Sequence, residues 1–160
     1  MPKFQMQVTL SQTANYTTAR VADGTLASEQ LAEADVNKLV KLVGDSRYGL
    51  CAVGDQIEGV LEVAGDNQPQ DGFAVGTVRT DHRLKVTLDG LQATPGTGAI
   101  AIGDYVVAGT VVARGTVQGS VPPKVCKATA APGGLVHKWR LVSILSGTTA
   151  VGGVGVIERV

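Results

Sequence analysis

Residues 84–89 read Leu84-Lys85-Val86-Thr87-Leu88-Asp89, so that apolar and polar side chains alternate strictly. Because successive side chains of a strand point to opposite faces, this period of two predicts a strand with one apolar and one charged face. Residues 57–63 alternate in the same way. Further short strands are predicted between Gly, Pro, Asn and Asp at 38–43, 50–53, 74–79, 105–107, 110–117, 124–128, 139–145 and 154–158.

About ten short strands with frequent turn signals predict an all-β fold, built as a single β-barrel or β-sandwich domain. A parallel α/β fold is excluded, because the chain lacks the helices that would connect parallel strands. At most one short helix is expected, over residues 28–35, where strong helix formers follow Ser28.

The N-terminal residues 1–25 are predicted to form an arm, and residues 26–160 the β-rich domain. Phe4, Met6, Val8 and Leu10 alternate with polar residues, which predicts one extended strand. Such a strand would leave its backbone unpaired, so it must add to its own sheet or to that of a neighbour.

Two similar turns are predicted, at Gly54-Asp55 and at Gly103-Asp104, 49 positions apart. In each, glycine permits a positive φ and the aspartate accepts backbone N–H bonds, so that a strand begins from a tight turn. Val43-Gly44-Asp45 is a partial third example. The similarity has two interpretations, a duplicated β-motif or a common way to turn a chain.

The composition is that of one ordinary globular domain: 160 residues, 44% hydrophobic and 18% charged. A chain of this length can build a core without disulfides or a structural metal. It contains no apolar stretch near the roughly 20 residues of a membrane helix, and residues 1–12 lack the apolar block of a secretion signal. We therefore expect synthesis in the cytoplasm and no membrane partner.

The formal net charge is zero, but residues 1–72 carry −5 and the remainder +5. Between Asp104 and Glu158 there is no acid, while Arg114, Lys124, Lys127, Lys138 and Arg140 supply five positive charges. Such a stretch would attract nucleic acid or the acidic half of another copy, unless folding mixes the two halves. Nucleic-acid binding is not expected, because Tyr105 and Trp139 are the only aromatic residues near the basic stretch.

The sequence offers little for catalysis. His82 and His137 are the only histidines, and Cys51 and Cys126 the only cysteines, and no pair has the spacing of zinc ligands. Both cysteines are expected to be buried free thiols, although a disulfide between them stays open. Glu58 and Glu62 are interpreted as a charged outer face. No catalytic residue, cofactor or metal is expected.

Five phrases in a fixed order resemble the small capsid decoration (cement) proteins of tailed bacteriophages. They are residues 33–42, 50–61, 102–107, 138–143 and 155–160. Together these short β-turn phrases cover most of residues 30–160. The family pattern usually has glycine where Asn37 stands, and asparagine can replace it because it tolerates the left-handed region. Residues 1–29 match nothing in the family.

The resemblance implies a non-enzymatic structural protein on the outside of a virion capsid, where it clamps neighbouring major capsid protein subunits together. It also implies self-association, with trimers expected before dimers. A carbohydrate-binding or fibre-type β-module is the alternative, which would need an exposed aromatic platform. The candidate contacts with the capsid or a sister subunit are Phe4, Met6, Val8, Leu10, Lys124, Lys127, Trp139 and Arg140. Trp139 fits either a core or an interface between subunits.

Overall fold

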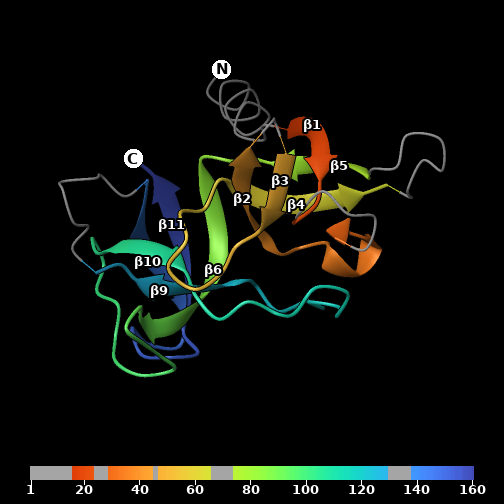
Figure 1. Cartoon of the computed structure of the whole chain (residues 1–160). Helices are drawn as coiled ribbons and strands as arrows, with labels where there is room; N and C mark the ends of the chain where they lie inside the picture. Colours follow the sequence, from red (N-terminus) through yellow and green to blue (C-terminus); the bar gives the residue numbers. More distant parts are fainter. Residues whose placement is uncertain (1–15, 24–28, 45–46, 66–73, 130–137) are drawn as a thin grey trace, which may run out of the picture.

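The computed structural model describes residues 16–23, 29–44, 47–65, 74–129 and 138–160. The described residues form an all-β protein, as predicted (Figure 1). The strands are β1 (Tyr16–Val21), β2 (Leu39–Gly44), β3 (Arg47–Leu50), β4 (Gly59–Ala64), β5 (Val75–Arg79), β6 (Arg83–Leu91), β7 (Thr94–Pro95), β8 (Tyr105–Ala108), β9 (Lys124–Lys127), β10 (Trp139–Ser146) and β11 (Val154–Arg159). One 3-10 turn, η2 (Glu33–Asp35), precedes β2.

The strands form two closed arrangements that lie side by side (Figure 1). In the first barrel the order is β1-β3-β2-β4-β5, and antiparallel pairing of β1 with β5 closes it. In the second ring the order is β11-β10-β8-β9-β6, and antiparallel pairing of β11 with β6 joins its ends. Strand β7 pairs with the last two residues of β6, Gly90 and Leu91. The molecule is thus more elaborate than one barrel or one sandwich.

Three local predictions were wrong. Residues 110–117 are not a strand but part of a loop from residue 109 to 123, the crossing loop, because their backbone bonds to the side chains of Asp35, Lys38 and Asp89 instead of to a strand. The strand expected at 50–53 lies instead at β3 and ends at Leu50. The described part of the helix expected at 28–35 contains only η2, because Gln30 pairs with Ala22 as a β-bridge.

The N-terminal arm is only partly described. The strand predicted from Phe4 to Leu10 lies outside the described residues. Strand β1 was not predicted, yet it pairs with β5 on one side and with β3 on the other. The described residues before position 25 are therefore built into the first barrel.

One core connects the barrel and the ring. Leu39, Ile57 and Val60 from the first half of the chain pack with Trp139 and the apolar residues of the second ring. Trp139 is fully buried, and its Nε1 donates to the carbonyl oxygen of Ile57 at 2.8 Å. Truncation of a buried tryptophan to alanine costs about 3–5 kcal/mol. A second, smaller cluster fills the first barrel around Val21, Leu61 and Val78.

The two predicted turns have the same hydrogen bonds. In Ala52–Asp55 the aspartate carboxylate accepts from the Ala52 amide at 2.6 Å, and in Ala101–Asp104 it accepts from the Ala101 amide at 2.8 Å. Gly54 and Gly103 have φ of 89° and 95°. In both turns the amide of the glycine and the carbonyl of the aspartate bond to one buried residue, Ala108 for the first turn and Leu141 for the second.

A third turn of this kind lies a further 49 residues along the chain, at Ala150-Val151-Gly152-Gly153. Gly152 has φ 86°, its amide donates to Leu88, and the Leu88 amide donates to Gly153. A Cβ at residue 153 would overlap the carbonyl oxygen of Thr148, so aspartate does not fit there. The Thr148 hydroxyl takes its place and accepts from the Ala150 amide at 3.2 Å. The repeat therefore favours a threefold-repeated β-motif, which the sequence pattern shows only twice.

We predict that Gly153→Ala destabilises the protein far more than Gly152→Ala. At residue 152 the new Cβ meets open space, so the cost is backbone strain at positive φ, about 1–2 kcal/mol. At residue 153 the backbone of Thr148 has to move, and we expect more than about 3 kcal/mol. Urea unfolding of both variants measures the difference. Equal losses would contradict the explanation for the missing aspartate.

Candidate functional site

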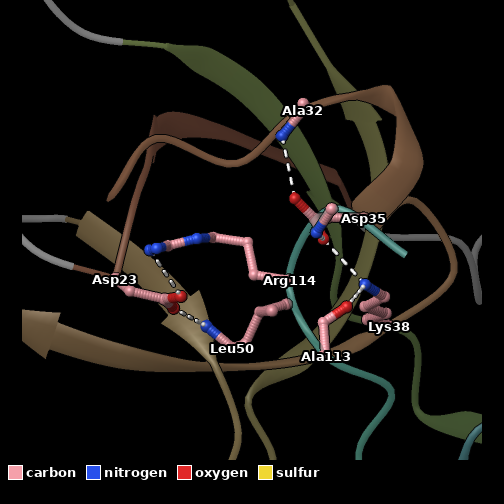
Figure 2. A network of polar contacts seen from close by, with 8 residues as sticks. Asp23, Ala32, Asp35, Lys38, Leu50, Ala113 and Arg114 are labelled. Atoms are coloured by element: carbon pink, nitrogen blue, oxygen red, sulfur yellow. Dashed lines mark hydrogen bonds and ion pairs between the residues drawn. The ribbon is translucent and has the colours of Figure 1, made fainter. Parts of the chain in front are cut away.

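The crossing loop is attached to the first barrel by a buried ion pair (Figure 2). Turn η2 places Asp35 beside Lys38, whose Nζ lies 2.7 Å from the Asp35 Oδ1 and is almost fully buried. Lys38 Nζ also donates to the Ala113 carbonyl at 2.7 Å, and the Gly115 amide donates to Asp35 Oδ1 at 2.7 Å. The ion pair therefore binds the backbone of the loop at two positions, Ala113 and Gly115. We call Asp35, Lys38 and these two loop contacts the clamp.

The clamp carboxylate is ionised because its bonds outweigh its burial. Burial by itself would raise the pKa of Asp35, but hydrogen bonds from Lys38, Ala32 and Gly115 and the charge of Lys38 hold the pKa below its ordinary value. The Ala32 amide supplies its bond to Oδ2 at 3.0 Å. Each oxygen of the buried carboxylate thus has at least one donor, as a buried charge requires.

Further acids fix the loop at its beginning and beside the clamp. The buried Asp89 accepts from the Thr110 amide at 2.8 Å and pairs with Lys124 at 3.3 Å. Burial would raise the pKa of Asp89, and the bonds from Thr110 together with the Lys124 charge lower it. Asp23 pairs with Arg114 at 3.3 Å and accepts from the Leu50 amide at 2.6 Å (Figure 2).

A groove lies between the end of the crossing loop and the first barrel. Its larger hollow, of about 590 Å³, is lined by Glu33, Val36, Asn37, Glu62, Val63, Ala64, Val117 and Gly119. A smaller hollow of about 190 Å³ shares Asn37 and Gly119 with it and continues past Val60, Arg79, Lys85, Ser120, Val121 and Pro122–Pro123. Asn37 has φ 69°, in the left-handed region that asparagine tolerates. These two hollows together are the candidate interaction site.

The predicted basic contacts carry internal ion pairs. Lys124 pairs with Asp89, Lys127 with Asp104 at 2.9 Å, and Arg140 with Glu158 at 3.7 Å. The other two bases of the acid-free stretch pair with acids of the first half of the chain, Arg114 with Asp23 and Lys138 with Glu58. All five bases have an acidic neighbour, and through Arg114 and Lys138 folding joins the charges of the two halves.

The remaining predicted contacts divide into buried and undescribed residues. Trp139 is in the shared core rather than on the surface, and the Arg159 guanidinium lies over its ring at 5.8 Å from the ring centre. Phe4, Met6, Val8 and Leu10 lie outside the described residues, as does His137. Of the predicted contacts that the structure describes, Lys124, Lys127, Trp139 and Arg140, none lines the two hollows.

The other reactive side chains are dispersed. Cys51 and Cys126 are free and buried, as expected. Burial raises the pKa of both thiols, that of Cys126 to about 11, with the charge of Asp89 adding to the effect. His82 is exposed, 3.5 Å from Glu158. Glu58 and Glu62 pair with Arg159 and Arg79. Within the described ranges, no group of three metal-ligating side chains is found, and no helix there has the length and apolarity to cross a membrane.

Sequence reasoning missed Asp35, Lys38 and Asp89. A signal for Lys38 was present, because the period of two in residues 38–43 places Lys38 on the same face as Val40, which is fully buried. A lysine on an apolar strand face requires a partner, and Asp35 lies three residues away. The groove had no such signal, since it forms between segments that are far apart in the sequence.

Comparison with protein-family models, curated proteins and solved structures finds no match.

We predict that Asp35→Asn destabilises the protein by about 3–5 kcal/mol, because it leaves the buried Lys38 charge without its counter-charge. Asp23→Asn is the matched control, since Asp23 and Arg114 are both about one-third exposed, and we expect a loss below about 1 kcal/mol. Urea unfolding at neutral pH measures both values.

The loss of stability caused by Asp35→Asn should depend on pH. A carboxylate with a lowered pKa stabilises the folded state above its ordinary pKa, 3.8, and this contribution declines as the pH falls below that value. The difference in unfolding free energy between the wild type and the variant should therefore shrink between neutral pH and acid. A difference that does not change with pH would contradict an ionised clamp.

Proposed function

We propose that this chain is a structural protein of a tailed-phage virion that binds the outer surface of the capsid and stabilises it by bridging major capsid protein subunits. The support from sequence is the order of five phrases that resemble capsid decoration proteins. The partners are the major capsid protein and further copies of the chain, and the function is exerted by contacts alone.

The observation that carries the proposal is rigidity. A closed barrel and a closed ring share one core, and a buried ion pair fixes the long loop between strands β8 and β9. A body that is already ordered loses little conformational entropy when it binds. Many such bodies on one shell hold by avidity even when each contact is weak.

The body also presents apolar side chains at fixed places. The second residue of each repeated turn is aliphatic and exposed: Val53 at 45%, Ile102 at 62% and Val151 at 42%. Because the third and fourth residues of each turn are bonded to a buried residue, these side chains are held without a flexible linker. They suit contact with another protein surface better than they suit solvent.

The carbohydrate-binding alternative has less support. Trp139, the only tryptophan, is fully buried. In the described part of the chain, the most exposed aromatic side chains are Tyr16 at 57% and Tyr105 at 42%. They lie on strands of different sheets, so they do not provide the stacking surface that sugar binding uses.

We expect purified protein to bind undecorated, expanded phage shells at a fixed ratio to capsid subunits and to raise their rupture temperature. Cosedimentation measures the ratio, and calorimetry of the shells with and without the protein measures the temperature. Asp35→Asn, unfolded by mild urea, is the matched control, and it tests whether attachment requires the folded protein. Failure to bind any mature shell offered, with the protein folded, would count against the proposal.

The contribution of the N-terminal arm can be tested in the same assay. Removal of residues 1–14 leaves β1 complete, whereas removal through residue 24 would take a strand out of the first barrel. We expect the shorter deletion to weaken attachment while the circular dichroism spectrum of the folded protein is kept. Unchanged attachment would show that the arm does not contribute.

A further inference from the structure

The groove has the properties of a binding site for an extended segment. Its two hollows meet at Asn37 and Gly119, so they form one continuous depression along β4 and the crossing loop. Three large aliphatic side chains along it are exposed, Val63 at 52%, Val117 at 71% and Val121 at 55%. Single exposed valines are common, but three along one groove indicate a surface that a partner covers.

The groove is acidic at its larger end. Glu33 lies in its wall and has no ion-pair partner among the described residues. Glu62 lies 3.2 Å from Arg79, which also pairs with Asp81. A suitable partner segment is therefore extended, apolar on one side and basic or neutral rather than acidic.

The chain contains such a segment. Over residues 4–10, Phe4, Met6, Val8 and Leu10 form one apolar side, Lys3 precedes them, and no acid occurs before Asp23. We propose that residues 4–10 of one copy bind in the groove of a second copy. The proposal concerns the association of the chain with itself and does not depend on binding to a capsid.

The register of the first barrel favours a second copy over the same copy. Tyr16 pairs with Arg79, which pairs with Val60, while Ala19 pairs with Gly76, which pairs with Ala64. Strands β1 and β4 thus run in the same direction, and the chain before Tyr16 enters at the Val60 end. A segment that continues out of β1 is directed away from Glu62 and Ala64 in the larger hollow.

The connecting residues are also short. If residues 4–10 occupy the groove, only residues 11–15 join them to Tyr16, and five residues span at most about 18 Å. Tyr16 is two strand spacings, about 10 Å, from β4, whose residues Glu62 to Ala64 line the larger hollow, so a connection into that hollow would have to reverse direction. A neighbouring copy can offer its groove without this reversal, and exchange around a symmetry axis closes into a ring.

The test uses two full-length variants, each with one new cysteine. Met6→Cys lies in the middle of the apolar segment, and Val117→Cys lies in the groove at a highly exposed position, so folding should be unaffected. The native thiols are buried and their raised pKa keeps them unreactive under mild oxidation. When the two variants are mixed and oxidised, a disulfide between them can only join two copies.

We expect the mixture to give a cross-linked heterodimer on a non-reducing gel, at least about tenfold more than Met6→Cys mixed with Leu145→Cys. Leu145 is 57% exposed and does not line the groove, so it measures random collision. Equal yields in both mixtures would overturn the proposal. So would a double variant, Met6→Cys with Val117→Cys, that closes its disulfide only within one chain, because the groove would then bind its own arm.

Discussion

The arrangement of the molecule depends on how one buried lysine is satisfied. Lys38 directly precedes β2, and its ammonium group is out of contact with water, where an unpaired charge would be very costly. Asp35 supplies the counter-charge, and the carbonyl of Ala113 supplies a further acceptor from 75 residues away. The first barrel is therefore electrostatically complete only when the crossing loop lies against it, and that loop forms one wall of the groove.

The net charge of the whole chain is zero, but its two halves carry opposite net charges. The acidic first half and the basic second half bond across the molecule, as Asp23 does with Arg114 and Glu58 with Lys138. The basic stretch therefore does not present a continuous positive surface, although its sequence suggests one. The described surface does present aliphatic side chains: valines along the groove, and Val53, Ile102 and Val151 at the repeated turns.

Most strands were predictable because their signals are local: β6 follows directly from alternation, and β11 from a short apolar run bounded by turn residues. Prediction failed where a distant residue decides the conformation. Residues 110–117 have the composition of a strand, yet Asp35 and Asp89 bind their backbone amides, and helix formers near Glu33 give way to a turn that presents Asp35. The third repeated turn was missed for a steric reason, because Thr148 leaves no room for the aspartate that marks the other two. The groove forms between segments that are far apart in the sequence and had no local signal.

The closure of the second ring by pairing of β11 with β6 has a consequence for folding during synthesis on the ribosome. The first barrel has all its strands once Arg79 has emerged, but β6 must wait for residues 154–159, some seventy positions later, before its open edge is covered. Until residue 139 is made, Leu39 and Ile57 lack Trp139, and until residue 113 is made Lys38 lacks the carbonyl of Ala113. The nascent chain thus passes through a partly folded intermediate with an unpaired strand edge and an exposed apolar surface. At this stage, copies that are synthesised close together are most prone to aggregate.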